Sequence, residues 1–410
     1  MPRIKVMVVD DSVVIRRMLT DLLAAEADIE VVGHASNGKI ALAKLPQLAP
    51  DVVTLDIEMP EMDGLEAVRE IRKQWRHLPV IMFSTLSERG AQATLEALSA
   101  GATDYVTKPS NSGSMAGAQE KIREQLIPKI RHLGARAHAP ARPALVPPSA
   151  RPRPSRLTPL NTRTVDPAHD RPPGSGVGRP TPSFTRIQEA GAPAAPVRHR
   201  PTAGNGDIDI VAIGCSTGGP NALVEIMPKL PANLAVPIVI TQHMPPLFTK
   251  FLADRLTALS KITVIEVAGG EVLRPGTAYL APGDHHLVLE KRGTDVVATL
   301  TQTPPENSVR PAVDVMLRSV VACYERRVLS VILTGMGQDG LHGSELVHET
   351  GGRVIAQDEE SSVVWGMPGF VARAGIAEAV LPLSAIADAI RERVEATVAR
   401  RALRSHGVGH

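Results

Sequence analysis

The stretch "DIDIVAIGCSTGGPNALVEIM", residues 207 to 227, decides the fold of the second half of this chain. It begins as an apolar run, turns through small residues and continues with a helical pattern, which together predict a buried strand followed by a helix. Strand–turn–helix units of this kind build open parallel sheets. Cys215 and Ser216 lie side by side in the turn. The turn could present a nucleophile, bind a phosphate group or simply connect the strand to the helix.

Similar apolar runs recur towards the end of the chain and predict a doubly wound α/β domain over residues 207–400. One part of it, near residues 278–301, has the pattern of an antiparallel excursion. The runs are "IDIVAIG", "PIVITQ", "TAYLAP", "HLVLE", "VVATLTQ", "VLSVILTG" and "GRVIAQD".

Residues 1–132 predict a separate domain, because five short apolar runs alternate there with helical stretches such as residues 13–26. Five strand–helix units predict a doubly wound, five-stranded parallel sheet of the flavodoxin-like type. The runs are "IKVMVV" (4–9), "VVGHA" (31–35), "DVVTLD" (51–56), "PVIMFS" (79–84) and "DYVTK" (104–108).

Residues 133–206 differ in composition from both flanks and predict a flexible, extended linker. They hold 15 of the 35 prolines of the chain, and eleven Arg, no Lys and three acidic residues give them a charge of +8. Such a segment is either a spacer between domains or a basic arm for an acidic partner or nucleic acid. The spacer is favoured, because Phe184 is the only aromatic residue of the segment, too few to interleave with eleven arginines.

The overall composition, with 43 % hydrophobic and 21 % charged residues, is typical of a globular protein, and the net charge of +2 favours neither nucleic acid nor a membrane surface. Two cysteines, Cys215 and Cys323, are too few for a disulfide framework. The N-terminus is unlike a secretory signal, and no apolar run approaches the roughly 20 residues of a membrane span. We therefore expect a cytoplasmic protein that neither enters a membrane nor binds nucleic acid.

Polar residues follow the expected strands of the first domain: Asp10 and Asp11, Asp56, Ser84 and Lys108. Strand ends of a parallel sheet meet at one edge, and converging carboxylates repel unless a cation lies among them. Carboxylates of this kind suit Mg²⁺, beside which Asp56 could attack a phosphoryl donor. A single aspartate at a strand end is more often a helix cap, but five matching positions favour a site.

The motifs "VDDS", "LDIEMPEMDG", "MFST" and "DYVTKP" resemble the receiver domain of two-component response regulators. The resemblance implies Asp56 as the phosphoacceptor, with a histidine kinase as phosphodonor. It further implies Mg²⁺ bound by Asp11, Asp56 and the Glu58 carbonyl, and Ser84 with Tyr105 as a switch pair. A receiver controls an output, which the second domain should supply.

In the second domain, Ser216 needs a general base to become nucleophilic. His243 follows the next apolar run and is the first candidate; His285 and His286 also follow a strand-like run. Cys215 is the rival nucleophile, but adjacent side chains at a strand end point to opposite faces. If Ser216 faces the cleft, Cys215 faces the core. The phosphate-loop alternative lacks the expected glycine spacing.

An acid that orients the histidine should come from a third strand end. Asp339 qualifies, in "VLSVILTGMGQDG", with Asp284 and Asp314 as rivals. Glycines flank Met336 in this turn, so its backbone N–H is a candidate for an oxyanion hole. The backbone N–H groups after Ser216, beginning with Thr217, start a helix and are candidates for the same role.

The ordered motifs "IGCSTGGP", "TQHMPPLFTKFLADRL", "YLAPGDHHL", "RPAVDVML", "ILTGMGQDG" and "VVWGMP" resemble the catalytic domain of chemotaxis protein-glutamate methylesterases of the CheB type. The resemblance implies a catalytic triad of Ser216, His243 and Asp339, with no cofactor for the ester chemistry. It implies a monomeric, phosphorylation-activated enzyme that demethylates glutamate methyl esters and deamidates glutamines on the cytoplasmic helices of chemoreceptors. Cys215 departs from the small residue usual there, and the linker is unusually long and basic.

Two other classes of function are open on sequence alone. One is a phosphorylation-dependent scaffold with an inactive hydrolase domain, against which the complete set of Ser216, His243 and Asp339 speaks. The other is a receiver-controlled DNA-binding regulator, against which the lack of a helix-turn-helix pattern after residue 207 speaks.

Overall fold

The computed structural model of the chain describes residues 2–108, 115–137 and 206–406. The expected linker therefore lies outside the described residues, apart from its two ends. At its start, the helix α5 (Met115–Ala137) continues past the expected boundary at residue 132. None of the described helices combines the length and the apolar character needed to span a membrane.

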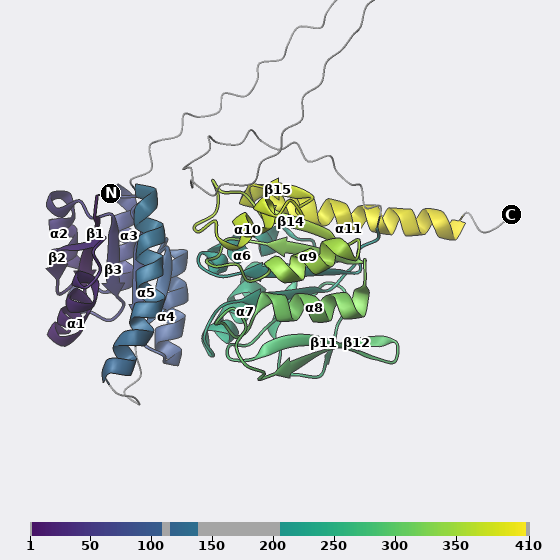
Figure 1. Cartoon of the computed structure of the whole chain (residues 1–410), viewed down its shortest axis with the longest axis horizontal. Coiled ribbons are helices and arrows are strands. Elements are labelled where there is room, and N and C mark those ends of the chain that lie inside the picture. The colour runs from purple at the N-terminus through teal and green to yellow at the C-terminus, as the bar shows by residue number, and fades with distance from the viewer. Residues whose placement is uncertain (1, 109–114, 138–205, 407–410) are drawn as a thin grey trace, which may run out of the picture. The chain divides into compact units, whose positions relative to one another are not determined.

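The N-terminal domain is a five-stranded parallel sheet with the strand order β2-β1-β3-β4-β5 (Figure 1). This order confirms the flavodoxin-like receiver fold, and it reverses between β1 and β3, where such sheets bind their ligands. The strands are β1 (Ile4–Val9), β2 (Ile29–Ala35), β3 (Val52–Asp56), β4 (Val80–Ser84) and β5 (Asp104–Thr107). Besides α5, the helices are α1 (Val13–Ala24), α2 (Gly38–Leu48), α3 (Gly64–Gln74) and α4 (Glu88–Ser99).

Side chains cap the N-termini of the first four helices of this domain. Ser12 caps α1, Asn37 caps α2 and Ser87 caps α4, while Asp63 forms a capping box with Glu66 at α3. Because Ser12 supplies the cap of α1, the two aspartates before it are not needed for capping. Apart from the hydrogen bond that Asp10 Oδ1 accepts from Ser12 N, their carboxylates can serve another role.

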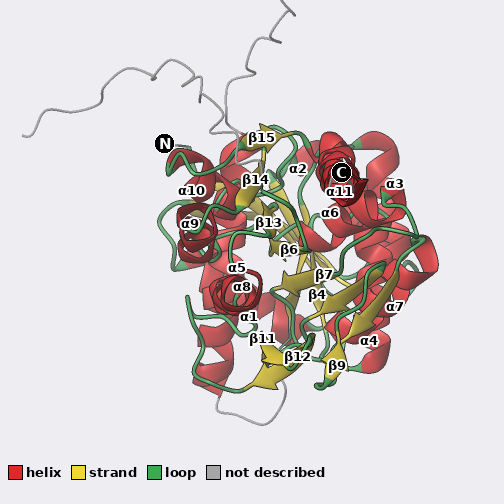
Figure 2. Cartoon of the chain, turned by 90° about the vertical axis from the view of Figure 1, so that its right-hand side faces the viewer, coloured by secondary structure: helices red, strands yellow, loops and turns green. Residues whose placement is uncertain are grey.

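The C-terminal domain is built on a seven-stranded sheet with the order β15-β14-β13-β6-β7-β10-β8, in which every pair of neighbours is parallel (Figure 2). The order again reverses, here between β6 and β13, so the doubly wound architecture is confirmed. The strands are β6 (Ile210–Cys215), β7 (Ile238–Gln242), β8 (Thr263–Glu266), β10 (Thr277–Leu280), β13 (Val328–Ile332), β14 (Arg353–Gln357) and β15 (Ala379–Leu381).

The antiparallel part of this domain is smaller than expected. β11 (His286–Arg292) and β12 (Asp295–Thr301) form a hairpin, to which β9 (Glu271–Val272) adds a third strand. The run around residue 278, expected to be antiparallel, is β10 and pairs in parallel with β7 and β8. The apolar pattern of a short buried strand does not encode its direction, which explains this error.

The helices of the C-terminal domain cover both faces of the seven-stranded sheet. Their packing buries the central strands fully, and β6 has no exposed residue. This burial on both faces explains why β6 is an unbroken apolar run. The helices are α6 (Gly219–Ile226), α7 (Phe248–Leu259), α8 (Val313–Tyr324), α9 (Leu341–Glu349), α10 (Met367–Arg373) and α11 (Leu383–His406), with a short 3₁₀ helix η1 (Met227–Lys229) after α6.

Candidate functional sites

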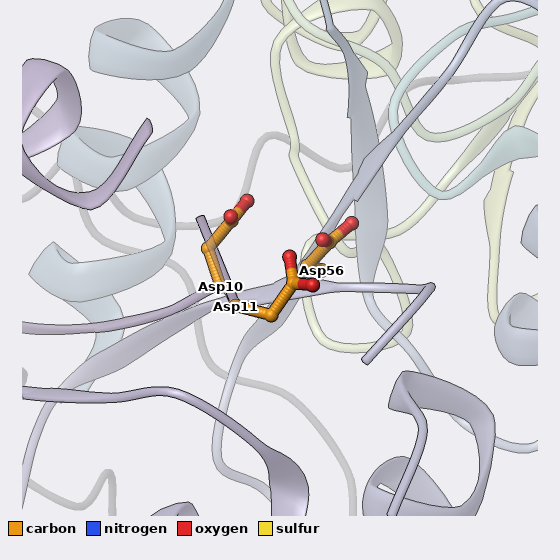
Figure 3. A group of neighbouring side chains, drawn as sticks. All are labelled: Asp10, Asp11 and Asp56. Atoms are coloured by element: carbon orange, nitrogen blue, oxygen red, sulfur yellow. The ribbon is translucent and has the colours of Figure 1, made fainter. Parts of the chain in front are cut away.

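Three aspartates of the N-terminal domain meet where its strand order reverses. Asp10 and Asp11 follow β1, and Asp56 ends the neighbouring strand β3. One carboxylate oxygen of each lies within 4.8 Å of the others (Figure 3). Asp10 and Asp56 are buried, whereas Asp11 is exposed. The structure thus brings together the carboxylates that the sequence predicted to converge.

Lys108 binds two of these carboxylates. Its Nζ atom lies 2.7 Å from Asp56 Oδ2 and 3.1 Å from Asp10 Oδ2. Burial and the charge of Asp10 raise the pKa of Asp56 to about 6, although Lys108 opposes the shift. Burial likewise raises the pKa of Asp10. One lysine does not compensate the buried negative charge, so the site favours an additional cation.

The oxygen-rich surroundings of the aspartates fit Mg²⁺. The pocket is lined by carboxylates, by Ser84 and by the loop that contains Ile57 and Glu58. Hard oxygen ligands with access from solvent are the donor set that Mg²⁺ prefers, since it keeps several of its waters. The exposed carboxylate of Asp11 is the one most accessible to an entering ion.

Ser84 and Tyr105 occupy different positions relative to this pocket. Ser84 lines it, and its Oγ donates to Gly90 O at 3.1 Å and accepts a hydrogen bond from Thr94 Oγ1 at 2.7 Å. Tyr105 is buried, its ring lies 5.4 Å from Lys129 Nζ, and it is not among the lining residues. Of the two proposed switch residues, Ser84 alone lines this pocket.

Sequence reasoning missed Gly64, which closes the loop around the phosphoacceptor candidate. A Cβ at this position would lie 2.1 Å from the backbone oxygen of Asp56, so only glycine fits. The dipeptide Asp63-Gly64 was the available signal, because a glycine directly after a helix cap often marks a close backbone approach.

In the C-terminal domain, Ser216 lies at the end of β6, where the strand order reverses. Its backbone N–H donates to Thr334 O, at 3.0 Å, in the loop after β13. The contact is close: a Cβ at Gly335 would lie 2.9 Å from Ser216 Cβ and 2.2 Å from Met367 Sδ. The loops after the two central strands thus enclose the serine.

His243 and Asp339 are joined although 96 positions separate them in the sequence. His243 Nε2 lies 2.7 Å from Asp339 Oδ2, and the backbone N–H of His243 donates to Cys215 O, the residue before Ser216. Both side chains are largely shielded, with exposed fractions of 11 % and 3 %. Within the described residues Ser216 Oγ makes no hydrogen bond to His243, a contact that often tightens only with substrate bound.

The carboxylate of Asp339 is bound by the start of α8. The backbone N–H groups of Val313 and Asp314 donate to it at 2.6 and 3.0 Å, and Asn307 Nδ2 donates at 3.0 Å. Burial opposes ionisation of Asp339, but the bonds from His243 and from these amides outweigh burial and lower the pKa of the carboxyl group. Asp339 is therefore an ionised carboxylate, and it accepts a hydrogen bond from the N–H at Nε2 of His243.

The rival acids and bases have other partners. Asp284 pairs with Arg310 at 2.6 Å, and Asp314 accepts a hydrogen bond from Gly343 N at 2.7 Å. His286 is fully buried, accepts the backbone N–H of Ala312 at Nδ1 and reaches Pro304 O with Nε2. His285 Nδ1 lies 3.3 Å from Gly283 O. Among the candidate pairs of a base and an acid in the described residues, only His243 and Asp339 are joined by a hydrogen bond.

Two backbone amides remain open beside Ser216. In the described part of the chain, the N–H groups of Thr217 and Met336 donate to no other backbone group.

Cys215 is fully buried in the hydrophobic core, as expected, and burial raises the pKa of its thiol far above the ordinary value.

The sequence matches two known families, the response regulator receiver domain over residues 6–119 and the CheB methylesterase domain over residues 211–390. It is 46 % identical to the protein-glutamate methylesterase/protein-glutamine glutaminase of Trichodesmium erythraeum, covering 96 % of this chain and all of the relative. It is 48 % identical to the protein of the same name from a Nocardioides strain, covering 96 % of each.

Among solved structures, the catalytic domain of the Thermotoga maritima CheB methylesterase is 47 % identical and covers 45 % of this chain and 98 % of that one, with a TM-score of 0.45. The alignments with the two relatives cover 96 % of this chain, which includes both matched domains. This chain therefore belongs to the CheB family of receiver-linked protein-glutamate methylesterases/protein-glutamine glutaminases.

Proposed function

We propose that Ser216, His243 and Asp339 carry out the protein-glutamate methylesterase reaction of this family. The observation that supports this most is the 2.7 Å contact between His243 Nε2 and Asp339 Oδ2 at the strand end that bears Ser216. Because Nε2 bonds to the carboxylate, Nδ1 is the nitrogen left to act as the general base. Asp339 then holds the ring and stabilises the imidazolium that forms.

The reaction proceeds through an acyl-enzyme. Ser216 Oγ attacks the carbonyl carbon of a γ-glutamyl methyl ester, and its proton passes to His243 Nδ1. The amides of Thr217 and Met336 donate to the resulting oxyanion. The bond to the methoxy oxygen breaks, that oxygen takes the proton from His243, and methanol leaves. Water then attacks the acyl carbonyl carbon, and its proton passes to His243. The bond to Ser216 Oγ breaks, Oγ takes the proton from His243, and glutamate is released.

The same site would hydrolyse the side-chain amide of glutamine, since only the leaving group differs. Ammonia then takes the place of methanol, and His243 protonates the leaving nitrogen. The substrates are the cytoplasmic helices of chemoreceptors, whose glutamines and methylated glutamates are the matching groups. Their hydrolysis gives sensory adaptation in chemotaxis.

The receiver domain would control this activity through phosphorylation of Asp56 by the histidine kinase of the pathway. Asp11, Asp56 and the Glu58 carbonyl would hold Mg²⁺, which supplies positive charge against the phosphoryl oxygens. Asp10 and Lys108 complete the charge balance, and Ser84 with Tyr105 would report the modification. The proposal places the protein in the cytoplasm, where the kinase and the receptor helices are found, and treats it as a monomer.

Replacing Ser216 by alanine tests the nucleophile. In Ser216→Ala we expect methanol release from methylated receptor to fall by at least about a thousandfold, because the acyl-enzyme cannot form. The thermal unfolding temperature should stay close to that of the wild type, since only one hydroxyl oxygen is lost.

Cys215→Ala is the matched control, because it changes the adjacent residue and the rival nucleophile. This variant should keep methanol release within about threefold of wild type, since the thiol lies in the core. Turnover retained by Ser216→Ala and lost by Cys215→Ala would refute the assignment of the serine.

A further inference from the structure

Asn307 lies behind the acid of the proposed triad and bridges two buried carboxylates. Its Nδ2 atom is 3.0 Å from Asp339 Oδ1 and 3.0 Å from Asp314 Oδ2. An amide nitrogen carries two N–H donors, so a single asparagine binds both carboxylates at once. Asp314 is fully buried and Asp339 is 3 % exposed, so water does little to screen one from the other.

The charge of Asp314 works against Asp339. Burial and the neighbouring Asp339 raise the pKa of Asp314, although a hydrogen bond from Gly343 N opposes the shift. Asn307 thus donates to both of the carboxylates that repel each other. The other titratable and charged groups around the pair are His243, His286, His342 and the Glu306–Arg318 ion pair.

The backbone conformation of the loop around Asn307 places its side-chain amide against the two carboxylates. Asn307 and Ser308 have φ angles of 53° and 64°, in the left-handed region that asparagine tolerates better than most residues. A bridge between Glu306 and Val309 closes the turn, and Glu306 is held by Arg318 of α8. The loop is therefore anchored to the same helix whose first amides bind Asp339.

We propose that Asn307 is a positioning residue of the triad, which aligns the Asp339 carboxylate with His243 and offsets the charge of Asp314. This inference rests on the proposed function. Without the amide, the negative charge of Asp339 is less compensated and stabilises the imidazolium of His243 more strongly. The histidine then keeps its proton to higher pH, where it cannot act as a base.

The experiment compares Asn307→Gly with Ser308→Gly in the full chain. Glycine accepts the left-handed backbone without strain, so the first variant removes the amide alone. We expect its kcat/KM for methylated receptor to fall about tenfold, mainly through kcat, because a hydrogen bond to a charged group is lost. The acidic limb of its pH–rate profile should move to higher pH. Ser308→Gly changes the adjacent residue, which has the same backbone conformation, and should retain the wild-type profile.

NMR titration of the His243 imidazole supplies a readout without turnover. Protonation of the ring should persist to higher pH in Asn307→Gly than in wild type and Ser308→Gly. An unshifted ring titration overturns the inference, as does a rate loss without movement of the acidic limb. A wild-type chain that hydrolyses no ester would refute the proposed function separately, while the ring titration would still decide the role of Asn307.

Discussion

Ser216 and Cys215 are sequence neighbours with opposite surroundings. The thiol is buried in the core, with Sγ 3.8 Å from Thr241 O, and burial raises its pKa far above the ordinary value. A thiol in such surroundings remains protonated and is a poor nucleophile. The alternation of side chains along a strand therefore assigns the two residues to the core and to the cleft.

Gly335 packs against Ser216, so adding a single methyl group there tests how tightly the serine is held. In Gly335→Ala, the new Cβ would lie 2.9 Å from Ser216 Cβ and 2.2 Å from Met367 Sδ, so the serine must shift. We expect esterase kcat/KM to fall by about tenfold or more, because small displacements in an active site are costly.

Gly206→Ala is the control for this change, since a Cβ there meets only ordinary contacts at 3.6 Å. Its esterase activity should equal that of the wild type. Full activity in Gly335→Ala would show that the loop after β13 does not constrain the nucleophile.

At the scale of elements, the start of α8 works as an anion site. Two of its backbone N–H groups donate to Asp339, and the helix dipole favours the negative charge there. His286 in turn holds the Ala312 amide just before the helix with its Nδ1. Asp339, the acid of the proposed triad, is thus held by a helix from another part of the chain.

A second cluster links β14 and α11 through Glu378, the residue before β15. Glu378 accepts hydrogen bonds from Arg353 Nη2 at 2.7 Å and from Arg393 Nη2 at 2.8 Å. Burial opposes ionisation of Glu378, but these two arginines lower its pKa. A carboxyl group with a lowered pKa contributes stability above its unfolded pKa and loses it as the pH falls through the folded value.

Replacing Glu378 by glutamine should therefore destabilise the C-terminal domain at neutral pH by about 1–2 kcal/mol, because the bonds involve partly buried charges. The difference from wild type should shrink as the pH falls through the lowered pKa of Glu378, because the wild-type carboxyl group is then protonated as well. Chemical unfolding of both proteins at several pH values measures it. A constant difference across that range would exclude the ion pairs as its source.

At the scale of the whole molecule, a receiver domain precedes an esterase domain in one chain. Phosphorylation-dependent regulation follows from this order of domains, because a receiver acts by biasing the conformations of an attached output.

Asp56→Asn tests the control of the intact chain. With Mg²⁺ and a small acyl phosphate as phosphodonor, we expect the esterase rate of wild type to rise several-fold, and that of the variant to stay at the basal level. Removal of Mg²⁺ by a chelator should abolish the activation of wild type, since the buried carboxylates need a cation. The rate of methanol release is the measurement.

Asp21→Asn is the matched control, because Asp21 lies on the exposed face of α1 in an ion pair with Arg17. It should be activated like the wild type. Activation of Asp56→Asn to the same level would exclude Asp56 as the acceptor.

Local pattern was enough to predict much of this protein. Buried runs such as Ile210–Cys215 require strands covered on both faces, and turns of small residues after them specify the starts of helices. Because strand ends in a doubly wound sheet meet at one edge, Asp10, Asp56 and Lys108 were predicted to converge, and the structure confirms it. The short strands β8 and β15 were not predicted, because three or four residues are too few to show a periodic pattern.

Only the tertiary structure decided which distant side chains meet. His243 was one of three candidate bases and Asp339 one of three acids, and the sequence could not rank them by contact. Asn307 was not a candidate at all, because its amide reaches Asp339 through a left-handed loop that has no periodic pattern. Periodicity records burial along one element, whereas a hydrogen bond between elements depends on how they pack. The sequence by itself therefore determined most of the strands and helices and the sheet edge that carries the candidate sites. The packing of these elements determined which side chains form hydrogen bonds with one another.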